Sequence, residues 1–414
     1  MAADDSILPR GLQRSLDESL QDTPVICLLG PRQCGKSTLT KSLAPNRDYL
    51  DLDDDNLADT ALADPAGFVR GLPEKVTLDE VQRVPEILRA LKVSVDANRT
   101  PGRYILTGSA NLLLLPRASE SLAGRMEILR LHPLTESEKE KTPGLFLETL
   151  LTTGFSPEIR PSTDEHATLP ERLVTGGYPE ARKRSPHRIP VWHRNYLQTL
   201  FEKDAPEIST IRDSSQLLRL ITKLALQSGS LLNKSSLSRD LDLDRETVDH
   251  YLAVLERLFL IRTLPAWHRN RSKRLVKSPK IHLTDSGLAA TLMDLRPSDW
   301  NPRRQDFGHL LESFVVQQLM AQAGWTDPTL QFNHYRDRDQ VEVDCLISRG
   351  NQVWGIEVKT SRSVSPADYK GLKKLAEQVG QDFQSGIILY SGDSILSSGD
   401  DRFLAVPLSK LWEL

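Results

Sequence analysis

The chain has 414 residues, enough for about two or three domains, and its apolar and charged content is ordinary for a soluble globular protein. The formal net charge of −3 excludes neither nucleic-acid nor protein partners, because the charges are unevenly distributed along the chain. No apolar run reaches about 18 residues, so we expect no membrane partner. The three cysteines, Cys27, Cys34 and Cys345, lack metal-site or disulfide spacing. With no signal peptide recognisable, they predict a cytoplasmic protein.

Leucines at positions 8, 12, 16 and 20 predict a leading helix within residues 1–20. An apolar run at 25–29 then predicts a buried strand. Residues 30–37 read Gly-x4-Gly-Lys-Ser, and a helical pattern follows them. Strand, glycine-rich loop and helix in this order are typical of a phosphate-binding loop (P-loop), whose backbone N–H groups surround phosphate oxygens.

This loop predicts ATP and Mg²⁺ as cofactors. We expect Lys36 to contact the β- and γ-phosphates and the Ser37 hydroxyl to bind Mg²⁺. The expected nucleotide-binding residues are Gly30, Pro31, Arg32, Gln33, Cys34, Gly35, Lys36, Ser37 and Thr38.

A second motif lies at 76–80, where an apolar strand pattern ends in Asp79 and Glu80. About 40 residues after a P-loop, such a pair predicts metal and water chemistry. We expect Asp79 to hold Mg²⁺, directly or through water, and Glu80 to polarise the attacking water.

The strand pattern at 103–108 is followed by polar side chains that can reach a γ-phosphate. Ser109 and Asn111 are the candidates and Thr107 is the reserve, with ordinary turn chemistry as the alternative. Arg125 precedes the next strand and is the candidate to reach the γ-phosphate of a neighbouring subunit. Arg117 is the other candidate, and a surface ion pair is the alternative for both.

Several motifs together resemble the prokaryotic AAA+ ATPases that carry a fused C-terminal domain of unknown function. The resemblance implies a nucleotide-dependent ATPase that acts as a homo-oligomer, and it supplies no substrate. The motifs occupy residues 30–36, 78–82, 106–109, 122–125, 132–135, 176–180 and 201–204.

The middle of the chain has a different organisation. We expect a loop or insertion over 141–170 and a helix over 187–204. Over 215–285, three helical patterns and two strand patterns predict a winged helix-turn-helix. The segment 262–280 has no acidic residue and carries Arg262, Arg269, Arg271, Lys273, Arg274, Lys277 and Lys280. This basic segment indicates nucleic-acid contact, most simply with DNA, whereas acidic residues in the third helix favour a protein partner.

The last region holds a second group of charged residues. Glu312 lies on a predicted helix, Asp344 on a strand, and Glu357 and Lys359 on one face of the next strand. This series resembles the PD-(D/E)xK nuclease-like fold. The resemblance implies that Asp344 and Glu357 hold Mg²⁺, that Lys359 orients the water, and that Glu312 completes the site. A buried network that fixes the fold, or a site that binds nucleic acid without cutting, are the alternatives.

The predicted fold class is α/β: a P-loop AAA+ ATPase domain, a winged-helix module and a restriction-endonuclease-like α/β module. The predicted boundaries are 1–140 for the ATPase core, 141–210 for a helical connecting or lid region, 211–290 for the winged helix and 291–414 for the nuclease-like domain. We expect a Mg²⁺-dependent ATPase that drives or switches a DNA-binding, nuclease-like domain. The alternative is a nucleotide-dependent switch or remodeller of a protein partner, with an inactive nuclease-like fold.

Overall fold

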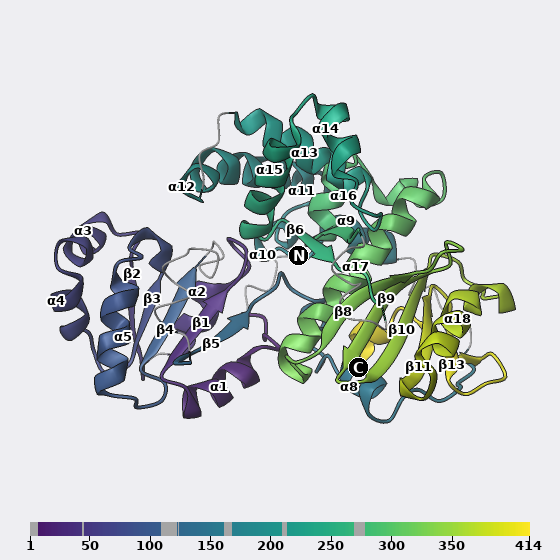
Figure 1. The fold of residues 1–414 in the computed structure, drawn as a ribbon, viewed down its shortest axis with the longest axis horizontal. Coiled ribbons are helices and arrows are strands. Elements are labelled where there is room, and N and C mark those ends of the chain that lie inside the picture. Colours follow the sequence, from purple (N-terminus) through teal and green to yellow (C-terminus); the bar gives the residue numbers. More distant parts are fainter. Residues whose placement is uncertain are drawn as a thin grey trace.

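The computed structural model describes residues 7–43, 45–108, 122, 124–160, 168–208, 213–268 and 278–414. These residues form three lobes: an N-terminal lobe around a parallel sheet, a helical region, and a C-terminal module around a second sheet (Figure 1). Within the described ranges, no helix is both long enough and apolar enough to cross a membrane.

The N-terminal lobe is built on a five-stranded parallel sheet with the order β2-β3-β4-β1-β5. All five residues of β1 are buried, as expected for a parallel strand covered on both faces. The strands are β1 Val25–Leu29, β2 Asp48–Asp51, β3 Val76–Asp79, β4 Tyr104–Gly108 and β5 Met126–Arg130. The helices are α1 Gln13–Asp22, α2 Lys36–Lys41, α3 Asp55–Ala63, α4 Pro65–Arg70 and α5 Ile87–Ala97, with a 3₁₀ turn at Val81–Arg83.

The two faces of this sheet have separate apolar cores. α1 packs Leu16 against one face, together with Leu12, which directly precedes the helix. α5 packs Leu88 and Leu91 against the other face. The predicted leading helix is therefore present, but it begins at Gln13, so Leu8 lies outside it.

The helical region begins with two short helices that pack toward the C-terminal module. The sequence predicted a loop over 141–170, yet Phe146–Leu151 is helical because Phe146, Leu147 and Leu150 are buried in the apolar core shared with α17. The first helices of the region are α7 Glu136–Glu140, α8 Phe146–Leu151, α9 Leu169–Thr175, α10 Pro179–Arg182, α11 Ile189–Thr199, a π-helical turn at Leu200–Asp204 and α12 Ala205–Ile208, with a 3₁₀ turn at Pro186–Arg188.

Three helices and a two-stranded antiparallel sheet follow in the predicted order. The side chains of Asp213, Asn233 and Asp244 accept backbone N–H groups at the starts of these helices, which explains where each begins. The assignment of this unit as a winged helix remains a prediction. Its elements are α13 Ser214–Leu226, α14 Lys234–Leu241, α15 Arg245–Arg257, β6 Ile261–Leu264 and β7 Lys280–Leu283, followed by α16 Ser286–Leu292 and a 3₁₀ turn at Pro297–Asp299.

The C-terminal module is a mixed six-stranded sheet with the order β12-β13-β11-β10-β9-β8. α17 packs against one face of the sheet and α18 against the other, each with its own apolar core. The elements are α17 Arg304–Thr326, β8 Gln331–Arg336, β9 Glu342–Arg349, β10 Gln352–Lys359, α18 Lys370–Val379, β11 Phe383–Tyr390, β12 Leu396–Ser397, β13 Phe403–Pro407 and α19 Lys410–Glu413, with 3₁₀ turns at Pro366–Tyr369 and Gly380–Asp382.

Arg10 connects the N-terminal lobe with the helical region. Its Nε donates to Oε1 of Glu138 at 3.0 Å, and its two terminal nitrogens donate to the carbonyls of Cys34 and His132 at 2.7 and 2.6 Å. The side chains of Arg10 and Glu138 are only 8% and 5% exposed. The pair is therefore a buried ion pair that also holds the P-loop backbone.

We expect Arg10→Met to lower the free energy of unfolding by about 3 kcal/mol, because the buried Glu138 carboxylate loses its cation. Chemical denaturation measures this loss. Arg14→Met is the matched control, since Arg14 and Glu18 form an ion pair that is 85% and 63% exposed. That control should change stability by less than about 0.5 kcal/mol. Equal effects of the two substitutions would contradict the role given to Arg10.

Candidate nucleotide site and carboxylate centre

The P-loop leaves the carboxyl end of β1 and turns into α2, as the sequence predicts. Gly35 has φ 105°, in the left-handed region where glycine is favoured. Gly30 passes so close to β5 that a Cβ there would lie 2.2 Å from the carbonyl oxygen of Leu131. Both glycines are thus required by the backbone path.

Lys36 begins α2, and its residue is only 4% exposed. Its Nζ donates to the carbonyls of Gly30 and Pro31, both at 3.0 Å. The ammonium group therefore lies within the curve of the loop, where a phosphate-binding lysine is needed.

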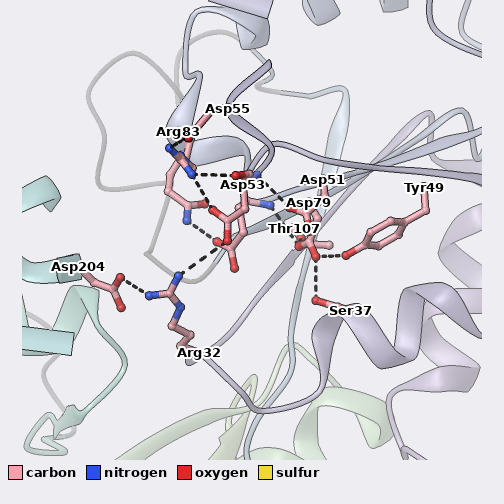
Figure 2. A network of polar contacts seen from close by, with 12 residues as sticks. Arg32, Ser37, Tyr49, Asp51, Asp53, Asp55, Asp79, Arg83, Thr107 and Asp204 are labelled. Atoms are coloured by element: carbon pink, nitrogen blue, oxygen red, sulfur yellow. Dashed lines mark hydrogen bonds and ion pairs between the residues drawn. The ribbon is translucent and has the colours of Figure 1, made fainter. Parts of the chain in front are cut away.

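Asp79 is the centre of a hydroxyl cluster at the carboxyl edge of the sheet (Figure 2). The Ser37 hydroxyl donates to Oδ2 of Asp79 at 2.7 Å, and the hydroxyls of Tyr49 and Thr107 also donate to this carboxylate. Asp79 is 2% exposed. Burial, followed by the hydrogen bond to Asp79, raises the pKa of the Tyr49 phenol well above its ordinary value.

Ser37 and Asp79 offer the hard oxygen donors that Mg²⁺ prefers, next to a loop shaped for phosphate. The residues therefore fit Mg²⁺ bound together with a nucleotide. Across the described ranges, no group of three or more His, Cys, Asp or Glu side chains is arranged to hold a metal ion by itself. A nucleotide phosphate is accordingly the natural source of the remaining ligands.

Glu80 follows Asp79 in a left-handed backbone conformation, with φ 53° and ψ 45°. Gln82 donates to its carboxylate through the side-chain amide. This unusual conformation for a non-glycine residue sets the direction of the Glu80 side chain at the edge where the P-loop lies.

Arg32 connects the P-loop with the helical region. Its guanidinium donates to Oδ1 of Asp204 at 2.5 Å and lies 3.9 Å from Oδ2 of Asp53 (Figure 2). Burial opposes the charge of Arg32, but Asp204, Glu80 and Asp53 outweigh it and raise the pKa of the guanidinium. The Tyr196 hydroxyl lies 3.1 Å from the carbonyl oxygen of Arg32. Side chain and backbone of one loop residue are thus both held by the helical region.

A pocket of about 270 Å³ lies beside the P-loop, between the end of β5 and the β6 hairpin. Gly30, Pro31, His132, Glu256 and Arg262 are among its lining residues. Burial, with the nearby charge of Arg130, lowers the pKa of Arg262 to about 10. The hairpin therefore contributes a cation close to the loop.

The other predicted ATPase residues are differently placed. Ser109, Asn111 and Arg117 lie outside the described residues. Arg125 precedes β5 and donates from Nε to Oδ1 of Asp96 at 2.5 Å. Because β5 runs parallel to β1, Arg125 lies at the sheet edge opposite the P-loop, roughly 16 Å away at about 3.3 Å per strand residue. It does not face the P-loop of its own chain.

The second group of predicted residues is brought together in the C-terminal module. Glu312 of α17, Asp344 of β9 and Glu357 of β10 lie close enough to influence one another's charge. We call these three residues the carboxylate centre. Lys359 donates to Oε1 of Glu357 at 2.9 Å, and the backbone N–H of Val358 donates to Oδ2 of Asp344 at 3.0 Å.

Lys280 is a member of this group that sequence reasoning missed. Its Nζ lies 2.7 Å from Oε1 of Glu312 and 3.1 Å from Oδ1 of Asp344. Burial alone would lower the pKa of Lys280, but Asp344 and Glu312 outweigh it, so the pKa is raised and the ammonium form is held. In the sequence, Lys280 is one of seven cations in a basic segment. Only its position at the start of β7 distinguishes it from the other six.

Tyr49, Asp204 and Arg10 were also missed as site residues. Tyr49 lies on β2, and its contact with Asp79 depends on the pairing of β2 with β3. Asp204 belongs to a stretch noted for family resemblance, with no role attached. Arg10 reaches the P-loop through contacts more than 20 residues apart, which no local pattern reveals.

Comparison with known families divides the chain into three parts. Residues 22–139 match an AAA domain, residues 166–299 match a domain of unknown function (DUF8612), and residues 307–411 match another domain of unknown function (DUF4143). The first match covers the P-loop, Asp79 and the whole parallel sheet.

Among curated proteins, uncharacterized proteins of Mycobacterium tuberculosis and Mycobacterium bovis are each 31% identical over 353 residues, covering 84% of this chain and 73% of theirs. Among solved structures, the Walker-type ATPase of Pyrococcus abyssi is 16% identical, with a TM-score of 0.42, over 70% of this chain and 97% of that one. The RuvB Holliday junction branch migration motor of Thermotoga maritima is 16% identical, with a TM-score of 0.30, over 64% and 93%.

Family membership follows from the sequence identity and coverage shared with the mycobacterial proteins, together with the AAA match. The chain belongs to the same family as these mycobacterial proteins, and it is an AAA-type ATPase with a C-terminal DUF4143 domain.

Proposed function

We propose that this chain is a Mg²⁺-dependent ATPase that passes its nucleotide state from the P-loop to the helical region and the C-terminal module. The observation that carries this proposal is the position of Arg32. One guanidinium belongs to the phosphate-binding loop and is also bonded to Asp204 of the helical region at 2.5 Å.

In the hydrolysis step, Lys36 would neutralise phosphate charge, and Ser37 and Asp79 would hold Mg²⁺, which supplies further charge stabilisation. Glu80 orients the attacking water as general base. Ser109, which lies outside the described residues, is the residue proposed to sense the γ-phosphate. Arg125 acts on the nucleotide of a neighbouring subunit in a homo-oligomer, a role that matches its distance from its own P-loop.

The transmission step follows from competition for one cation. A γ-phosphate near the P-loop attracts the Arg32 guanidinium, as do Asp204 and Asp53. Asp204 ends a π-helical turn, a conformation that often marks a functional position in a helix. Loss of the Arg32 contact would free this turn and the adjoining helices, so ATP and ADP would favour different arrangements of the helical region.

Two outputs fit such a switch. The basic segment 262–280, of which 269–277 lie outside the described residues, favours DNA, with the nuclease-like module brought to it. The acidic third helix favours a protein partner instead. We place DNA first because five cations lie within the nine residues 269–277, apart from Arg262, which lines the pocket, and Lys280, which is buried.

Asp79→Asn should reduce ATP turnover by about 100-fold or more, because the site loses the metal-facing charge. Steady-state phosphate release in Mg²⁺ measures it. Asp59→Asn is the matched control, since Asp59 is exposed on α3 in the same lobe. Wild-type turnover in Asp79→Asn would remove Asp79 from the mechanism.

Asp204→Asn should retain ATP binding while losing the difference in amide hydrogen exchange between the ATP and ADP states over α11 and the π-helical turn. The reason is that Arg32 then loses the charge of Asp204, the partner in the helical region that phosphate would replace. Glu202→Gln, an exposed neighbour on the same turn, is the control. The transmission proposal fails if Asp204→Asn keeps the full nucleotide-dependent difference.

DNA should increase the ATP turnover of the wild-type chain severalfold at low salt, and the increase should vanish in Arg271→Glu/Arg274→Glu. The physical reason is that phosphate contacts release counterions, so they weaken as salt rises. Arg14→Glu, which reverses an exposed charge on α1, is the control. Turnover that is indifferent to duplex and single-stranded DNA would favour the protein partner.

A further inference from the structure

Lys280 reaches the carboxylate centre from a different structural unit. It is the first residue of β7, whereas Glu312 belongs to α17 and Asp344 to β9. Its side chain is 3% exposed, and its Nζ contacts Glu312 at 2.7 Å and Asp344 at 3.1 Å. The carboxylate of Glu342 is 3.9 Å away. The ammonium is therefore enclosed by acidic oxygens from two elements.

This location is fixed by backbone pairing on both sides of β7. Lys280 faces Leu264 of β6 in the hairpin and forms a bridge with Leu231 on the other side. Next to that bridge, Gly229 approaches the centre so closely that a Cβ would lie 2.8 Å from Oε2 of Glu312. The lysine is thus held in register, unlike a flexible surface cation.

Two further ion pairs lie in and beside the centre. Lys359 pairs with Glu357 at 2.9 Å, and Arg336 pairs with Glu342 at 2.6 Å. Among the described residues, three cations, Lys280 included, therefore face the three carboxylates of the centre and the adjacent Glu342. Among the described residues, Oε2 of Glu357 is buried with no hydrogen-bond partner, so one carboxylate oxygen remains available in the centre.

Carboxylate oxygens are the donors that a divalent cation prefers, but with Lys280 in place the described carboxylates are not arranged to hold one. Such a cation needs these oxygens at about 2.0–2.6 Å, and an ammonium already seated between them both fills that volume and repels a second positive charge. Metal and Lys280 cannot share the centre.

We propose that Lys280 is the resident cation of the carboxylate centre. In the folded chain it prevents a divalent metal ion from binding between Glu312 and Asp344. Its ion pairs also connect the β6–β7 hairpin to the C-terminal module. The centre takes Mn²⁺ or Mg²⁺ only when the Lys280 ammonium is absent from it. This inference concerns the C-terminal module and does not depend on hydrolysis at the P-loop.

Mn²⁺ binding to the full chain without nucleotide tests the proposal, with free Mn²⁺ followed by electron paramagnetic resonance. Lys280→Met keeps the length of the side chain and removes its charge. We expect it to bind one equivalent of Mn²⁺ more than the wild type, and Mn²⁺ should raise its melting temperature more than that of the wild type. Lys280→Met/Asp344→Asn should lose the additional equivalent.

Lys280→Arg is the matched control, because it retains a cation and should gain no Mn²⁺. A folded Lys280→Met chain with the Mn²⁺ stoichiometry of the wild type would overturn the proposal. If Lys280→Met does not fold, the wild type and Asp344→Asn decide. An equivalent of Mn²⁺ bound by the wild type and lost in Asp344→Asn would show that Lys280 does not close the centre, whereas equal stoichiometries support closure.

Discussion

The P-loop is held by charged and polar groups from outside its own sheet, and these contacts connect it to the N-terminal segment and to the helical region. Arg10 donates to the carbonyl of Cys34, while Tyr196 contacts the carbonyl of Arg32. Asp204 binds the Arg32 side chain. A loop anchored in this way cannot change its conformation without disturbing the N-terminal segment or the helical region, so its geometry is linked to theirs.

The chain contains two buried acidic sites that are neutralised in different ways. Asp79 receives hydroxyl hydrogen bonds from Ser37, Tyr49 and Thr107, and these neutral donors can rearrange around an incoming cation. Asp344 instead faces the full positive charge of Lys280. Removing a hydroxyl contact costs about one hydrogen bond, whereas separating a buried ion pair costs several kcal/mol. The hydroxyl groups around Asp79 can therefore be displaced by a cation at low cost, whereas the ion pair between Lys280 and Asp344 is costly to break.

Local sequence pattern predicts the strands, most of the helices and the P-loop, because apolar periodicity and glycine requirements are local properties. Asp79 was identified since it ends a buried strand at the expected distance from Lys36. Lys280 and Asp204 were not, because their roles depend on which distant elements pack together, and the same residue types usually lie in solvent. Phe146–Leu151 was predicted as loop for a related reason: the helix is stabilised by burial against α17 rather than by its own propensity.

Contacts and short stretches of chain connect Arg32 of the P-loop with β7. The Tyr196 hydroxyl, which touches Arg32, lies 3.2 Å from that of Tyr178, and the neighbouring Gly177 donates its N–H to Asp285 at 2.6 Å. Asp285 follows β7, the strand that begins with Lys280. Residues in contact couple two sites energetically only where one of the elements between them can adopt two arrangements. In the proposed transmission step Arg32 supplies that condition, because phosphate would compete with Asp204 for it, and β7 is the strand on which a resulting displacement would act.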